Sequence, residues 1–156
     1  MKQILIASLM LSFLSVNFIK DLSFINSSAF AYDIKSGAIP NNASVKRAVH
    51  FFTINVPKTG LSSLTIQVPN DIKVNGKIEV RNQENKLVNN TYSIANNQVL
   101  IDFSPPASNN ETLMIRLEDV SATGLGTVWI YRLYGTTAKI DTTIPLGSRQ
   151  VRTYDN

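Results

Sequence analysis

The chain has 156 residues, a formal net charge of +4 and no cysteine. Its longest basic run is Lys46-Arg47, and no basic cluster is interleaved with aromatic residues, which argues against nucleic-acid binding. Without cysteine there are no disulfides, so the burial of apolar side chains must stabilise the fold.

The first 31 residues have the features of an export signal. Lys2 precedes an apolar run at 4–19, and Ala29-Phe30-Ala31 matches the small-residue pattern that signal peptidase recognises. We therefore expect cleavage before Tyr32. The alternative is an uncleaved anchor, but a membrane span usually needs about 20 apolar residues. After cleavage no stable membrane span is expected, and the destination is the periplasm, the cell surface or a thylakoid lumen.

Beyond residue 31, apolar residues recur with a period of two, which predicts an all-β chain. The predicted strands are 49–56, 61–68, 77–82, 91–95, 98–103, 112–120 and 127–135. In 49–56, His50, Phe52, Ile54 and Val56 share the more apolar face. In the other strands, the side chains expected to point inward or to share the apolar face are Leu64, Ile66, Val68, Ile78, Val80, Val99, Ile101, Phe103, Leu113, Ile115 and Leu117.

Turn residues separate these strands. Asn75-Gly76 is expected to supply a turn with positive φ, and Asn96-Asn97 a two-residue hairpin turn. Pro105-Pro106 and residues 108–110 are expected to form a loop, and 124–126 another turn.

Short strands at this spacing predict one antiparallel β-sandwich domain, immunoglobulin-like in size, with a small barrel as the alternative. We expect the domain at 48–140. Residues 32–47 and 141–156 have weak periodicity and are expected to form arms, the second ending in an edge strand at 148–154.

Catalytic residues are sparse in this sequence. His50 is the only histidine, and no G-x-S-x-G motif is present to position a nucleophile. We therefore expect His50 to be a core or edge histidine with a satisfied ring nitrogen. A hydrolase acting on a wall polysaccharide would have to use scattered carboxylates such as Asp102 and Glu118, which are both expected to point to solvent.

Metal ligands are equally sparse. A zinc site is not expected from one histidine and no cysteine. Candidate calcium ligands are Glu118 and Asp119 with Asp102 or Asp141, but no EF-hand spacing occurs and a solvated strand end is the simpler interpretation. No cofactor is predicted.

The stretch TVWIYRLYG at 127–135 contains the candidate binding residues Trp129, Tyr131, Arg132 and Tyr134. Alternation places Trp129 and Tyr131 on one face. If Val128 and Ile130 face the core, the two aromatic rings stand outward as a platform for a sugar or a protein partner. If Trp129 faces the core, the platform does not exist.

Four motifs together resemble a known family. They are F-x-I-x-V-P at 52–57, L-x-x-L-x-I-x-x-P at 61–69, F-x-P-P at 103–106 and P-L-G-x-x-x-x-x-T-Y at 145–154. The chain resembles a secreted domain-of-unknown-function family, found chiefly in cyanobacteria and some algal lineages. That resemblance implies an extracytoplasmic location and transfers no catalytic or binding residue.

Two functional hypotheses follow. The first is a non-enzymatic sandwich that binds an envelope glycan or a protein partner through 127–135 or the C-terminal arm, since strand edges expose backbone groups that a second chain can pair. An oligomer formed by exchange of that arm is a variant. The second is the hydrolase that would use Asp102 and Glu118. The sequence pattern does not indicate an oligomeric state.

Overall fold

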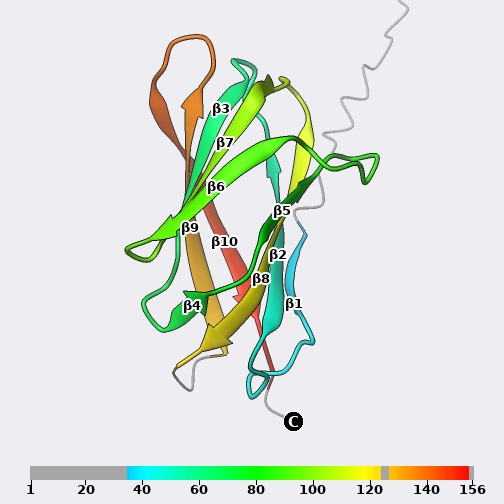
Figure 1. The fold of residues 1–156 in the computed structure, drawn as a ribbon, viewed down its shortest axis with the longest axis vertical. Helices are drawn as coiled ribbons and strands as arrows, with labels where there is room; N and C mark the ends of the chain where they lie inside the picture. Colours follow the sequence, from blue (N-terminus) through cyan, green and yellow to red (C-terminus); the bar gives the residue numbers. More distant parts are fainter. Residues whose placement is uncertain (1–34, 124–126, 155–156) are drawn as a thin grey trace, which may run out of the picture. The chain divides into compact units, whose positions relative to one another are not determined.

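The computed structural model describes residues 35–123 and 127–154, whose regular elements are ten β-strands in two sheets (Figure 1). All paired strands are antiparallel. The first sheet contains β1 (Ser36–Ile39), β2 (Ala48–Asn55), β4 (Ile72–Val74), β5 (Ile78–Arg81) and β8 (Thr112–Ala122). The second contains β3 (Leu61–Gln67), β6 (Asn90–Ala95), β7 (Gln98–Ala107), β9 (Val128–Thr137) and β10 (Thr143–Arg152). The predicted antiparallel β-sandwich is confirmed.

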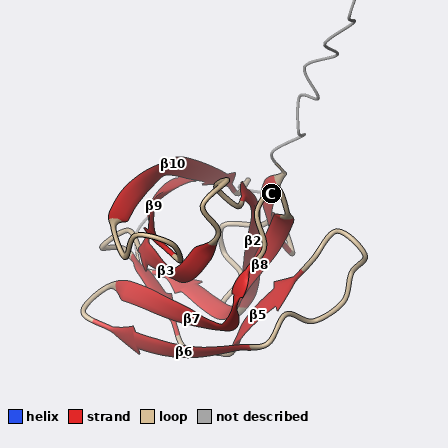
Figure 2. Ribbon diagram, turned by 90° about the horizontal axis from the view of Figure 1, so that it is seen from above, coloured by secondary structure: helices blue, strands red, loops and turns tan. Residues whose placement is uncertain are grey.

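The two sheets differ in width. The first has the order β1-β2-β8, and β4 and β5 both pair with the remaining edge of β8, at residues 120–122 and 114–117. The second has the order β10-β9-β3-β7-β6. At any height the first sheet is therefore at most four strands wide, whereas the second is five. Figure 2 shows the wider sheet curving from β10 round to β6.

Side chains from the facing surfaces of both sheets form one core. Every residue predicted to point inward is buried, including Leu64, Ile101 and Leu117, which have no exposed surface. The more apolar face of 49–56, which includes Phe52, is buried as well. Alternation succeeds here because each central strand has one face toward the other sheet and one toward solvent.

Two strand boundaries differ from the sequence prediction. Pro105 and Pro106 were expected in a loop but belong to β7, which runs on to Ala107. The register of β6 ends where Asn90 meets Phe103, so the two prolines lie beyond the part of β7 that β6 covers. The prolines also lie in the irregular part of the β3–β7 register, between Asp102 and Ala107, so a regular ladder needs their missing N–H groups on neither side. The three-residue strand β4 was not predicted.

The two predicted Asn turns have different outcomes. Asn96 and Asn97 have φ angles of 51° and 57° and join Ala95 to Gln98, so the two-residue hairpin is confirmed. Asn75 and Gly76 are not among the positive-φ residues, so that prediction is wrong. Glycine is needed at residue 76 because its backbone lies very close to that of β8. A Cβ there would lie 2.6 Å from the carbonyl oxygen of Glu118.

The segments expected as arms are parts of the sheets. Residues 36–39 form β1, which pairs with β2. At the C-terminus, β10 begins at Thr143, five residues earlier than expected, and pairs along most of β9. It is an edge strand, as predicted, but Val151 is fully buried, so β10 belongs to the core rather than to a separate arm. The predicted signal and the turn at 124–126 lie outside the described residues.

Candidate functional site

One lateral side of the sandwich is closed by hydrogen bonds between the sheets. The hydroxyl of Ser36 in β1 donates to the carbonyl oxygen of Gln150 in β10 at 2.6 Å. The side chain of Arg149 donates from Nε to the carbonyl oxygen of Thr53 in β2 at 2.8 Å. Burial lowers the pKa of Arg149. The side chains of Ser36 and Arg149 therefore link β10 of the second sheet to β1 and β2 of the first.

The opposite lateral side, between β5 and β6, is open. Tyr92 and Ile94 of β6 pair with Ile101 and Val99 of β7, whose side chains are fully buried, so all four side chains lie on the inner face of the second sheet. Yet Tyr92 is 43% exposed and Ile94 is 39% exposed. The narrower first sheet does not reach far enough to cover β6.

Two hollows lie beside this uncovered face. One of about 460 Å³ is lined by residues of β5 and β6 and the chain between them, including Ile78, Val80, Leu87 and Tyr92. The other, of about 240 Å³, lies between β4 and β6 and includes Ile94. We call these two hollows the open groove. Each hollow includes buried core residues, Ile78 and Val80 in the first and Ile72 and Val74 in the second, together with polar side chains at the rim. In the first hollow Leu87 is 65% exposed.

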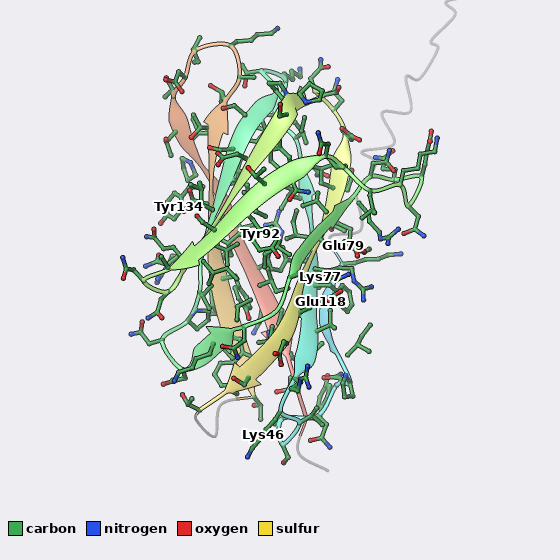
Figure 3. The ribbon with its side chains drawn as sticks, in the orientation of Figure 1. Lys46, Lys77, Glu79, Tyr92, Glu118 and Tyr134 are labelled. Carbon is green, nitrogen blue, oxygen red and sulfur yellow. The ribbon has the colours of Figure 1, made fainter. Side chains whose placement is uncertain are left out.

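A charge-balanced cluster lies along the β5 side of the open groove. Lys77 Nζ lies 3.5 Å from Glu79 Oε2 and 3.8 Å from Glu118 Oε1. Arg81 donates to Glu79, and this hydrogen bond lowers the pKa of Glu79. Figure 3 shows Lys77, Glu79 and Glu118 gathered beside β5, with Tyr92 on the strand that crosses in front. With two cations and two anions, this rim does not select for a charged ligand.

The aromatic residues of the predicted binding strand are in the core. Trp129 is 4% exposed and Tyr131 is fully buried, whereas Val128 and Ile130 are 44% and 54% exposed. The interpretation of Trp129 and Tyr131 as an outward platform is therefore wrong. Burying the larger aromatic face removes more apolar surface from water than burying Val128 and Ile130 would.

Arg132 and Tyr134 lie on the outer face of the second sheet. Arg132 is exposed and opposite Gln67, and Tyr134 is half-buried and opposite Thr65. A separate hollow of about 430 Å³ includes Arg132 and Ile130. Binding by Arg132 and Tyr134 stays a prediction.

His50 lies in the core, one of the two placements expected for it. Its Nδ1 is 2.6 Å from the hydroxyl of Tyr131, and both side chains are buried, so the pair links β2 of the first sheet to β9 of the second. Burial lowers the pKa of His50 from 6.5 to about 4 and raises that of Tyr131. The ring nitrogen is satisfied, which confirms the prediction, and Tyr131 is the partner that the sequence did not identify.

The candidate carboxylates do not share a cleft. Asp102 is exposed on β7 of the second sheet, and Glu118 lies on β8 of the first, beside Lys77. In the described part of the chain, no three His, Cys, Asp or Glu side chains gather closely enough to hold a metal ion. Asp119 instead pairs with Arg47 at 3.0 Å.

Sequence reasoning found β6 but did not assign it a role. The available signal was its composition, since 90–95 contains no charge and no proline, unlike a typical protected edge strand. Its exposure could not be foreseen, because that depends on the width of the other sheet.

Comparison with known proteins gives information on the fold alone. No family model matches the chain, and no curated protein matches it in sequence. Domains D2 and D3 of the major pilin SpaD from Corynebacterium diphtheriae have a TM-score of 0.52 at 9% identity, covering 76% of this chain. The chain spans 50% of that pilin fragment. The resemblance to a secreted cyanobacterial family stays a prediction.

Two further structures are of similar size to the described domain. The collagen-binding domain of a Staphylococcus aureus adhesin has a TM-score of 0.49 at 11% identity, with 77% of this chain and 95% of that chain covered. An uncharacterised Nocardia farcinica protein with an immunoglobulin-like fold has a TM-score of 0.49 at 10% identity, with 79% and 98% covered. The antiparallel β-sandwich of this chain is shown by its own two sheets. At these identities the likeness concerns the fold alone.

In the described residues, no helix has the length and apolar character needed to cross a membrane.

Proposed function

We propose that this chain is an exported, non-enzymatic binding module that takes up an extended segment of a protein partner in the open groove. The predicted signal at 1–31 supports export. The placement of Asp102 and Glu118 in different sheets supports a binding role over the hydrolase hypothesis.

The observation that carries this proposal is the orientation of β6. Ala95 and Gln98 flank a two-residue hairpin turn, so they form a hydrogen-bonded pair, and the backbone groups of Ala95, Ser93 and Thr91 point toward β7. The pairing of β7 with β3 agrees with this alternation. Val68 N–H, just after β3, donates to Asn97 O at 2.8 Å, so the backbone of the residue before Gln98 points toward β3 and not toward β6.

The backbone groups of Asn90, Tyr92 and Ile94 therefore point away from β7, along the free edge of the second sheet. Tyr92 and Ile94 also direct their side chains into the open groove. A strand added beside them would gain backbone hydrogen bonds, and every second side chain of that strand would fill the groove.

Hydrogen exchange measured by mass spectrometry tests this function. The probe is an uncharged eight-residue peptide in which valine and threonine alternate, added to dilute protein. We expect slower exchange at Tyr92 and Ile94, and we expect Tyr92→Lys to abolish that slowing. Thr91→Lys is the matched control, because its side chain is on the opposite face of the same strand.

Two results would contradict the proposal. One is unchanged exchange in 90–95 with every alternating peptide. The other is protection by an envelope glycan at Arg132 and Tyr134 alone, which would place binding on the outer face of the second sheet.

A further inference from the structure

The edge of β6 differs from the other sheet edges in the described residues. β1 has four residues and is followed by Pro40, and β4 has three. β10 contains Pro145 and a register shift between Pro145 and Gly147. Short length, proline and bulges are the features that stop sheet edges from pairing with other molecules.

The edge of β5 is already occupied by its own chain. Val88 N–H donates to Val80 O at 2.9 Å, and Leu87 forms a bridge with Arg81. β6 has no comparable protection, since it has six uncharged residues, no proline and no register shift against β7. Its free edge is therefore available to another strand.

An added strand must meet three conditions. It needs apolar side chains two residues apart to fill the groove beside Tyr92 and Ile94, polar side chains between them to face solvent, and no charge to desolvate. β6 itself meets these conditions, because Tyr92 and Ile94 alternate with Thr91 and Ser93. The strand and the site that it would enter are thus complementary to each other.

We propose that the partner at the open groove is a second copy of this chain, joined by antiparallel pairing of the two β6 strands. This inference rests on the proposed function and names its partner. The register that uses all three outward-facing residues sets Tyr92 opposite Tyr92 of the second copy and Asn90 opposite Ile94 of the second copy.

The resulting dimer has one twofold axis perpendicular to the joined sheet. The second sheets of the two copies form one continuous sheet, and both first sheets lie on the same side of it. The overhanging β6 strands meet between them, so the side chains that each copy leaves exposed cover one another. A contact of this kind is closed and does not propagate into a fibre.

Disulfide trapping tests the register in a chain that has no cysteine of its own. Directly opposed residues have Cα atoms about 5.5 Å apart, within the range that a disulfide spans. Tyr92→Cys is therefore expected to cross-link under mild oxidation. In Thr91→Cys the two sulfurs are offset by two residues along the strand, about 8 Å between Cα atoms, so we expect cross-linking at least about tenfold slower.

Sedimentation measurements test whether the chain forms a dimer. The protein for them is expressed from its complete sequence and purified. We expect a concentration-dependent dimer, which Tyr92→Lys converts to a monomer. The melting temperature of this variant should match that of wild-type protein diluted until it is monomeric. Thr91→Lys should keep the dimer. Ile94→Pro is a second test, because it removes an N–H of the free edge and none from the ladder with β7.

Three results would overturn self-pairing. They are a wild-type monomer at millimolar concentration, a dimer that persists in both Tyr92→Lys and Ile94→Pro, and equal cross-linking of the two cysteine variants. A monomer whose 90–95 segment is still protected by the alternating peptide would overturn the self-pairing alone and support strand addition by another polypeptide. A monomer without such protection would overturn both proposals.

Discussion

The two lateral sides of this sandwich are built differently. On the closed side, Ser36 and Arg149 reach across to backbone carbonyls of the opposite sheet, and β10 contributes the buried Val151. On the open side, β6 extends past the narrower first sheet and leaves Tyr92 and Ile94 exposed. The closed side therefore contributes to stability, whereas the open side retains surface and backbone groups that a partner can use.

The largest effect is expected when the closed side is removed. Truncation after Ile140 deletes β10, which exposes the core beside Val151 and removes the ladder along β9. We expect loss of the cooperative unfolding transition, measured by circular dichroism in urea. A truncated chain that still unfolds cooperatively would contradict the assignment of β10 to the core.

The link between His50 and Tyr131 is expected to make stability depend on pH. The pKa of His50 is 6.5 when unfolded and about 4 when folded, so the unfolded chain binds more protons between these values. The stability that comes from burying neutral His50 is therefore fully present above pH 6.5 and is lost as the pH falls toward 4. The loss in free energy of unfolding is about 3 kcal/mol.

Urea titrations between pH 4 and pH 7 measure this dependence. His50→Gln is the control, because glutamine does not titrate but can still hydrogen-bond to Tyr131. We expect its pH dependence to be reduced by the part due to His50. An identical pH dependence in both proteins would show that other groups are responsible.

Substitutions of two glycines, one on each lateral side of the sandwich, are expected to have effects of intermediate size on stability. In Gly76→Ala, the new Cβ would lie 2.6 Å from the backbone oxygen of Glu118, at a bulge of β8 where two residues stand opposite Val49. We expect a loss of about 2 kcal/mol, because backbone must shift. Gly37→Ala meets the end of the Phe51 ring at 2.9 Å, and a side chain can move aside.

For Gly37→Ala we therefore expect a loss below about 1 kcal/mol. Chemical unfolding of both variants measures the difference. If Gly37→Ala were the more damaging of the two, backbone closeness would not be the reason for glycine at residue 76.

The smallest effect on stability is expected on the open side. Tyr92→Ser changes a side chain that is 43% exposed, so its free energy of unfolding should change by about 0.5 kcal/mol or less. Its effect on binding should be large, because the open groove loses its aromatic wall. Thermal unfolding and peptide protection on the same sample measure the two, and a large loss of stability would mean that Tyr92 packs in the core.

The sequence by itself determined the class of fold and the inward residues. A period of two assigns each side chain to a face, and the alternation is strong because one face is buried. It also identified the Asn96-Asn97 hairpin, which depends on the local chemistry of two residues. It predicted a satisfied ring nitrogen for His50 but not the partner, because Tyr131 is 81 residues away along the chain. The sequence did not decide which face of 127–135 points to the core, because both faces contain apolar residues.

Only the tertiary structure decided which apolar side chains remain uncovered. Tyr92 and Ile94 have the same inward pattern as Val99 and Ile101, and the sequence pattern alone does not distinguish the two pairs. Their exposure follows from β4 and β5 sharing one edge of β8, which narrows the first sheet. Sheet width depends on the pairing of distant segments, so it is not encoded in the periodicity of any one strand.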